Sequence, residues 1–338
     1  MSKESFFPAK DVCLRRTLFP PLSTCGGGKV IMHKNQYLPT YFHNWMEMYK
    51  KGAVTDVTFR KYELTYQHLL KLAPRLSLGS ITRIEYQQLL NVFAEDHERQ
   101  TVMDFHHQVK AALLDAVEEG VIPRDPTRKV VIKGTVSRKH KPKFLNQHEL
   151  QKFLDQLELR GIPNVDYLLL LIAKTGLRFA EALAVTPQDV DFHRQMLNVS
   201  KTWSYKDSMG RFAKTKNKSS NRKIRIDWML CMQLKQLSEG RPEDKPLFIH
   251  EGKRIYNSTV NDRLARLCAQ ADVPIISVHG LRHTHASLLL YAGVSVASVA
   301  RPLGHANMST TQSTYLHIIK ELENQDNDRV MQFLSTLQ

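Results

Sequence analysis

A short basic segment divides the chain into two parts that each have their own apolar pattern. Residues 133–143, Lys-Gly-Thr-Val-Ser-Arg-Lys-His-Lys-Pro-Lys, hold one glycine, one proline and five Lys or Arg side chains, without apolar periodicity. Such a composition is typical of a connector between domains. Apolar residues at regular spacing occur on both sides of it. The sequence of 338 residues therefore predicts two domains, residues 36–132 and 144–338, joined by a linker over 133–143.

The first domain is predicted to be a small all-α bundle. Tyr41, Trp45 and Met48 recur at helical spacing, and Gly52 follows them as a stop. Three further helices are indicated by a Ser or Thr ahead of each helical pattern; they open near Thr55, Ser80–Thr82 and Thr101, and run to about Leu70, Phe93 and Gly120. Four helices of this length are enough for a bundle with its own core.

Residues 1–35 differ from the rest of the chain. They hold Pro8, Pro20 and Pro21 and the triplet Gly26–Gly28, and they show no sustained period. A disordered tail is expected there. The alternative hypothesis is that translation naturally starts at Met32, because the codons for the glycines and the following Lys-Val are purine-rich, as in a ribosome-binding site. An intact mass that retained residues before Met32 would exclude it.

The second domain is predicted to be mainly helical with one small sheet. Asn146 is expected to cap its first helix, and residues 167–173 form a buried helix that Gly176 ends. Between Met196 and Ile226 the period changes to two, which favours a small antiparallel sheet with a basic hairpin. Further helices are predicted over 178–185, 228–238, 258–271, 282–292, 295–301, 310–317 and 327–337. The fold class is thus mainly α and multidomain, with a mixed α+β second domain.

The charge of the chain indicates a polyanionic partner. Lys and Arg number 48 against 33 Asp and Glu, a net charge of +15, which favours nucleic acid. If both domains bind DNA, the linker cations would lie along phosphates; they are Arg138, Lys139, Lys141 and Lys143. A solvated connector without DNA contacts is the alternative.

Composition also disfavours several classes of protein. No apolar run is long enough to span a membrane, and no signal-peptide pattern opens the chain. The four cysteines are scattered without a CxxC pair. They are expected to be reduced thiols in a cytoplasmic protein, neither a metal site nor a disulfide framework.

Three short motifs would build one active site if the fold brought them together. They are Thr-Gly-Leu-Arg at 175–178, His-Gly-Leu-Arg-His at 279–283, and Leu-Gly-His followed by a tyrosine at 303–315. Arg178 and Arg282 could grip a phosphodiester through bidentate hydrogen bonds. Tyr315 could attack the phosphorus, with histidines nearby for proton transfer. This chemistry breaks and rejoins a DNA strand through a covalent link to the protein.

Three residues in or beside these motifs, Glu181, His283 and His285, could have either a structural role or a role in the active site. Glu181 lies three residues after Arg178, where it forms an ordinary ion pair or braces an active-site cation. His283 and His285 raise the question of a metal site. No Cys or carboxylate accompanies them at ligand spacing, so packing or helix-start roles are expected and no metal is.

Together the motifs resemble those of the tyrosine recombinase (phage integrase) family. The matching stretches are Thr-Gly-Leu-Arg-Phe-Ala-Glu-Ala-Leu, His-Gly-Leu-Arg-His-Thr-His-Ala-Ser-Leu-Leu and Leu-Gly-His…Thr-Thr…Tyr-Leu-His. The resemblance runs from about residue 36 to the end. It implies a SAM-like helical core-binding domain that a basic linker joins to a mixed catalytic domain.

The resemblance also implies a role for each site residue. Arg178 and Arg282 would clamp the scissile phosphate, and His305 would donate a further hydrogen bond to it. His279 would accept the proton of Tyr315, which attacks to give a 3′-phosphotyrosyl link. This link conserves the energy of the broken diester, so no metal or nucleotide cofactor is implied.

The family carries a hairpin lysine as general acid for the leaving 5′-oxygen. The family pattern places it six residues before an arginine, with serine between, which selects Lys216; Lys214 and Lys218 are close alternatives. Two positions depart from the family pattern. Gly280 stands where an acidic residue is frequent, and Asn217 where threonine is frequent.

The implied function is that of a site-specific recombinase that integrates or excises a phage or mobile element. It would act on double-stranded DNA as a tetramer, with helix 327–337 docked on a neighbouring protomer. An accessory directionality factor or a host DNA-bending protein would be a further partner. The alternatives are a Xer-like resolvase of chromosome or plasmid dimers, a type IB topoisomerase and a catalytically silent DNA-binding protein. The docking helix argues against the topoisomerase, and the complete residue set argues against the silent protein.

Overall fold

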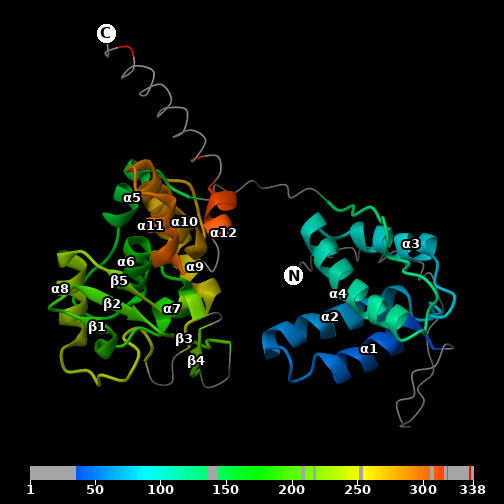
Figure 1. Ribbon diagram of the computed structural model, residues 1–338. Helices are drawn as coiled ribbons and strands as arrows, with labels where there is room; N and C mark the ends of the chain where they lie inside the picture. Colours follow the sequence, from blue (N-terminus) through cyan, green and yellow to red (C-terminus); the bar gives the residue numbers. More distant parts are fainter. Residues whose placement is uncertain are drawn as a thin grey trace, which may run out of the picture. The chain divides into compact units, whose positions relative to one another are not determined.

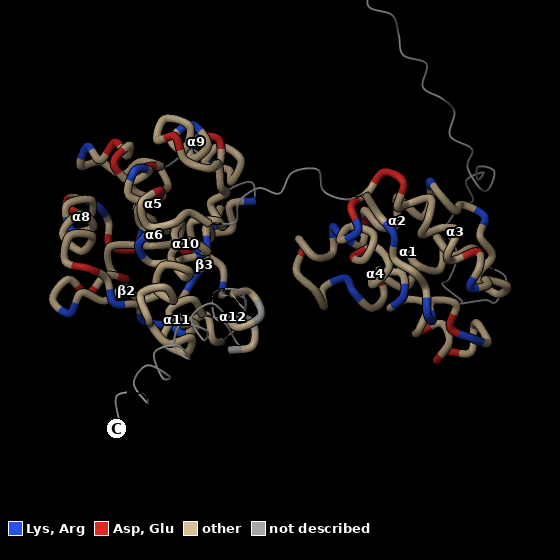
Figure 2. Tube along the Cα trace, turned by 90° about the horizontal axis from the view of Figure 1, so that it is seen from above, with Lys and Arg blue, Asp and Glu red and all other residues tan. Residues whose placement is uncertain are grey.

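The computed structural model describes residues 36–135, 144–206, 210–215, 218–250, 254–304, 308–315, 318 and 335. The chain divides into two compact units, Met1–Lys139 and His140–Gln338 (Figure 1). The boundary falls inside the basic segment 133–143. Each unit has its own hydrophobic core, and Lys and Arg residues are distributed over both units (Figure 2).

The described part of the first unit is a bundle of four α-helices. They are α1 (Leu38–Tyr49), α2 (Asp56–Leu72), α3 (Arg83–Ala94) and α4 (Arg99–Glu118). Helix α4 contacts each of the other three. Aromatic side chains fill the centre, where Tyr41, Trp45 and Tyr86 are fully buried, and Trp45 Nε1 donates to Asp115 Oδ2 at 2.6 Å.

Two of the predicted helix starts in this unit are confirmed, and one is wrong. Thr55 caps α2 through its side chain, and Thr82 forms a capping box with Glu85 at the start of α3. Helix α4 begins at Arg99, ahead of the predicted Thr101. The amide of Val102 already donates to the carbonyl of Glu98 at 3.1 Å, so the first turn is closed without a Thr cap.

The second unit is built around the apolar helix α6 (Val165–Thr175), whose side chains are almost all buried. Asn164 caps α6, and Gly176 ends it in the left-handed conformation, with φ of 64°. The other helices surround this core: α5 (Gln147–Leu154), α7 (Phe179–Leu183), α8 (Trp228–Ser238), α9 (Asn257–Gln270), α10 (Val278–Tyr291), α11 (Val296–Leu303) and α12 (Met308–Thr314).

Helix α10 begins earlier than the predicted start at residue 282. Ser277 caps it by accepting the amide of Gly280 at 3.1 Å. Buried Val278 and Leu281 belong to the hydrophobic core and fix this first turn. His279, Arg282 and His283 therefore all lie on one helix, which packs against α6.

The strands of the second unit form two small antiparallel sheets where one was predicted. In the first sheet, β2 (Met196–Val199) pairs with β1 (Val190–Asp191) on one side and β5 (Arg222–Arg225) on the other. In the second, β3 (Lys201–Trp203) pairs with β4 (Phe212–Lys214). The break comes at Ser200, where the chain changes its partner from β5 to β4. The mainly helical fold with a small antiparallel component is confirmed.

No helix among the described residues is long and apolar enough to cross a membrane. In the same part of the chain, no group of three or more His, Cys, Asp and Glu side chains could hold a metal ion.

Candidate active site

Arg178, at the start of α7, is held by both terminal nitrogens of its side chain and by its backbone amide. Its Nη1 donates to Glu181 Oε1 at 2.8 Å, and its Nη2 donates to the carbonyl of Gly304 at 3.2 Å. Its backbone amide donates to Glu181 Oε2 at 2.9 Å. The side chain is still 38% exposed. The guanidinium is thus held in place but open to a ligand.

Glu181 is the buried carboxylate of the site, with 3% of its surface exposed. Arg222 donates to it from Nη1 at 3.2 Å and from Nη2 at 2.9 Å, on the same two oxygens that accept from Arg178. Burial by itself would raise the pKa of Glu181, but the hydrogen bonds and charges of Arg222 and Arg178 hold that pKa below its ordinary value. The carboxylate therefore stays ionised and braces two arginines.

Arg282 is buried, with 3% of its surface exposed, and is held by backbone oxygens. Its Nη1 donates to the carbonyl of Gly176 and its Nη2 to that of Leu303, both at 2.6 Å. Burial, and then the positive charge of Arg178, lower the pKa of Arg282 from its ordinary value. A bound anion would relieve both effects, because it would supply the counter-charge that the carbonyls lack.

The turn after α11 brings the two predicted phosphate-binding arginines together. Arg282 donates to the carbonyl of Leu303, and Arg178 donates to that of Gly304, the next residue. Carbonyls of consecutive residues lie within a few ångströms of each other. The two guanidinium groups, from motifs 104 residues apart in sequence, therefore converge on one turn.

His279 lies one helical turn before Arg282 on α10, with its ring exposed. Partial desolvation, and then the positive charges of Arg282 and Arg178, lower its pKa from the ordinary 6.5. The ring is therefore neutral at pH 7 and can accept a proton. Its ring lies edge-on to that of His283, with the centroids 4.7 Å apart.

Tyr315 is buried, with 3% of its surface exposed, and its hydroxyl lies 2.9 Å from Nδ1 of His283. Burial raises the pKa of Tyr315 to about 12, and the charge of Arg282 opposes that rise. The hydroxyl is therefore protonated at pH 7 and needs a base to become a nucleophile. The histidine that hydrogen-bonds this hydroxyl is His283, one turn after His279 on α10.

His283 and Arg222 are the residues that the sequence did not single out for this site. His283 was assigned to packing or helix start, but it contacts the predicted nucleophile. Its position one turn after His279 on the same helix was the available signal. Arg222 is the arginine that follows Lys216 by six residues in the hairpin pattern, which assigns it no role of its own. His285 does have the packing role expected: its Nδ1 donates to the carbonyl of Ala173 at 3.1 Å, and burial lowers its pKa to about 4.

Several predicted residues lie outside the described part of the chain. These are Lys216, His305, the linker residues Arg138, Lys139, Lys141 and Lys143, the tail 1–35 with Met32, and, apart from residue 335, the helix 327–337. Their neighbours in the chain are described. Gly304, which precedes His305, touches Arg178, and the strands β4 and β5 flank Lys216.

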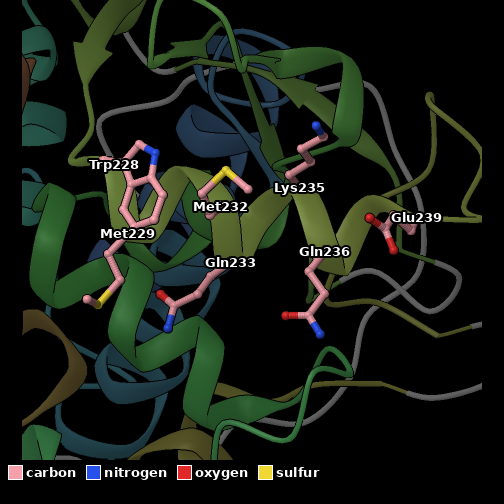
Figure 3. A pocket seen from close by; sticks show the side chains of 7 residues that line it. All are labelled: Trp228, Met229, Met232, Gln233, Lys235, Gln236 and Glu239. Carbon is pink, nitrogen blue, oxygen red and sulfur yellow. The ribbon is translucent and has the colours of Figure 1, made fainter.

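A pocket of about 380 Å³ lies elsewhere, along α8 (Figure 3). Trp228, Met229 and Met232 line it with exposed apolar side chains, together with Gln233, Lys235, Gln236 and Glu239. None of the predicted site residues lines it, so this pocket is separate from the arginine site.

Comparisons with known proteins identify the chain. Residues 143–321 match the model of the phage integrase family. A XerC-like tyrosine recombinase of Caldanaerobacter subterraneus subsp. tengcongensis is 27% identical over 308 residues, which cover 82% of this chain and 78% of that protein. The ICEBs1 integrase of Bacillus subtilis is 26% identical over 231 residues, 64% of this chain and 61% of that protein.

The fold also agrees with that of a solved structure. The Tn1549 transposon integrase, solved with a circular intermediate DNA, superposes with a TM-score of 0.70 at 17% identity over 82% of this chain and 94% of that chain. The resemblance drawn from the motifs is confirmed. Because the family match covers more than half of the chain and includes Arg178, Arg282 and Tyr315, the chain belongs to the phage integrase family of tyrosine-type site-specific recombinases.

Proposed function

We propose that the protein is an integrase that cuts and rejoins double-stranded DNA to insert or excise a phage or another mobile element. The observation that carries the proposal is the convergence of Arg178 and Arg282 on the consecutive carbonyls of Gly304 and Leu303. Relatives named as integrases of ICEBs1 and Tn1549, the latter in complex with DNA, support the mobile-element assignment. A Xer-like resolvase is the second candidate, because the XerC-like relative matches 82% of this chain.

The two arginines would hold the scissile phosphate and stabilise its transition state. A guanidinium has five N–H groups. In the described part of the chain, each of the two terminal nitrogens of Arg178 and of Arg282 donates one side-chain hydrogen bond. Donors therefore remain for the non-bridging oxygens. As the pentavalent transition state gathers negative charge, these fixed cations would stabilise it without rearranging. His305 is proposed as a further donor to the same phosphate.

Tyr315 would form the covalent link. Its oxygen bonds to phosphorus as the bond to the 5′-oxygen breaks, and the hydroxyl proton passes to a histidine of α10. His283 contacts the hydroxyl, and His279 lies edge-on to His283, so both are candidates for the base. The leaving 5′-oxygen would take a proton from the hairpin lysine, proposed to be Lys216. Rejoining reverses these steps with a new 5′-hydroxyl as nucleophile.

The remaining parts of the proposal concern partners and place. Core recombination sites in double-stranded DNA are the proposed substrate, with the linker residues Arg138, Lys139, Lys141 and Lys143 along the phosphates. Four protomers would assemble on DNA through helix 327–337, with a directionality factor or a host DNA-bending protein as accessory. A cytoplasmic location follows from the DNA substrate.

The test is formation of a covalent complex with DNA. The protein is incubated with a nicked duplex that carries the flanking sequence of its own gene, and the products are separated on a denaturing gel. We expect an adduct that Tyr315→Phe abolishes while DNA binding stays nearly unchanged, since one hydroxyl is lost. Tyr291→Phe, which changes an exposed tyrosine of α10, is the control and should leave the adduct intact. An adduct that persists in Tyr315→Phe would show that another residue is the nucleophile.

A further inference from the structure

Arg222 is a buried arginine with partners on three separate segments. Only 7% of its side chain is exposed. Its two terminal nitrogens form a fork with both oxygens of Glu181, at 3.2 and 2.9 Å. Its Nη1 also donates to the carbonyl of Ser220 at 2.8 Å, and its Nε donates to the carbonyl of Pro302. A charged fork of this kind fixes orientation as well as distance.

Two of these partners, Glu181 and Pro302, lead to the proposed phosphate-binding arginines. The carboxylate of Glu181 also accepts from the amide and Nη1 of Arg178. The carbonyl of Pro302 is followed in the chain by the two carbonyls that hold Arg282 and Arg178. Arg222 thus connects to Arg178 through Glu181, and to both arginines through the backbone of the Pro302–Gly304 turn.

The Pro302–Gly304 turn is built close against Arg222. Gly304 has a φ of 68°, and a Cβ placed on it would lie 3.0 Å from Nη1 of Arg222 and 3.2 Å from its Cζ. Arg222 is also the first residue of β5, the strand that follows β4 in the chain and pairs with β2. The guanidinium therefore lies where the start of β5, α7 and the turn after α11 meet.

We propose that Arg222 is a positioning residue of the recombination reaction. It fixes the carboxylate of Glu181 and the Pro302–Gly304 turn, so that Arg178 and Arg282 face one phosphate. Arg222 acts through these two and does not contact the DNA. The inference rests on the proposed function, because the phosphate is the ligand that the two arginines would share.

The competing explanation is that the ion pair of Arg222 and Glu181 only stabilises the fold. Buried ion pairs often add little net stability, because removing two charges from water offsets their attraction. Single-turnover cleavage of the nicked duplex, DNA binding and thermal unfolding are compared in three variants. These are Arg222→Ala, Arg222→Lys and the control Arg225→Ala, an exposed residue of the same strand.

We expect Arg222→Ala to slow cleavage by about 100-fold, as misplacement of reacting groups by about 1 Å does, with DNA binding within a few-fold of the wild type. Added guanidinium ion should restore part of the rate, because it can refill the fork. Arg222→Lys should also be slow, since an ammonium cannot bridge both carboxylate oxygens and a carbonyl. Arg225→Ala should cleave at the wild-type rate.

A second readout does not depend on DNA. The side-chain Nε resonances of Arg178 and Arg282 in the free protein should shift in Arg222→Lys and stay in place in Arg225→Ala. Unshifted resonances, or wild-type cleavage in a folded Arg222 variant, would overturn the positioning role. The positioning role would also be overturned if cleavage by the Arg222 variants fell only in proportion to the fraction of unfolded protein and guanidinium did not restore it. Shifted resonances in a protein whose wild type forms no adduct would support the positioning geometry and refute the proposed function instead.

Discussion

Gly176 is the position where one added methyl group should do the most measurable damage to the arginine site. Its φ is 64°, and a Cβ built on it would lie 2.8 Å from Cδ2 of His285 and 2.9 Å from Cδ2 of Leu303. The left-handed backbone costs an L-residue about 1–2 kcal/mol. Forcing a methyl group into packed side chains costs about 1–3 kcal/mol more. Gly176→Ala should therefore lower the free energy of unfolding by about 2–5 kcal/mol.

Gly293→Ala is the matched control for the Gly176 variant. Gly293 also has a positive φ, 80°, but no atom lies within 4 Å of the Cβ that alanine would add. It should lose only the backbone term, about 1–2 kcal/mol. Both glycines lie in the second unit, so the urea transition of that unit reports both variants. Equal losses in the two variants would refute the packing argument.

The same substitution should disturb the chemistry as well as the stability. The carbonyl of Gly176 accepts from Nη1 of Arg282 at 2.6 Å, so a shift of this backbone moves the guanidinium. At temperatures where both variants are folded, Gly176→Ala should cleave a nicked duplex about 100-fold more slowly. Gly293→Ala should cleave at the wild-type rate.

Two further predictions concern the histidines of α10. His283 contacts the hydroxyl of Tyr315, so His283→Asn should slow single-turnover cleavage by about 100-fold or more and His279→Asn by less; the reverse order would assign the proton to His279. The pKa of His285 falls from 6.5 to about 4 on folding, so between these pH values the unfolded chain binds one more proton than the folded chain. The free energy of unfolding therefore decreases as the pH is lowered. This residue should account for a loss of at most about 2 kcal/mol between pH 7 and pH 5. Urea titrations of His285→Asn should show a flatter pH dependence, and an unchanged slope would contradict the shift.

Local features of the structure were predictable because they depend on neighbours in the chain. The caps at Thr55, Thr82 and Asn146 and the stop at Gly176 are all confirmed. Each depends on contacts within about one helical turn, which the sequence displays directly. The start of α10 was missed because Gly280 is a poor helix former, and burial of the flanking apolar residues overrides that propensity.

Contacts between distant segments were beyond what the sequence could supply. Arg222 meets Glu181 across 41 residues, and Arg282 meets the carbonyl of Gly176 across 106. The motifs predicted that Arg178 and Arg282 act together, yet nothing in them indicates which backbone oxygens hold these side chains. The change of strand partner at Ser200 is another such case, because it depends on how the chain between β4 and β5 returns to the sheet.

The acceptors that hold Arg178 and Arg282 at the turn and at Gly176 are main-chain oxygens, which every residue type possesses. Replacing a side chain at Leu303 would remove apolar packing but would not delete the acceptor for Arg282. Tolerance to mutation should therefore be uneven around the site. Side-chain substitutions should be tolerated where only the carbonyl takes part in the site. They should not be tolerated at Gly176 and Gly304, whose positive φ values of 64° and 68° set the path of the backbone. In a library of random variants selected for DNA cleavage, these two glycines should tolerate fewer substitutions than Leu303, where another apolar side chain keeps the same carbonyl.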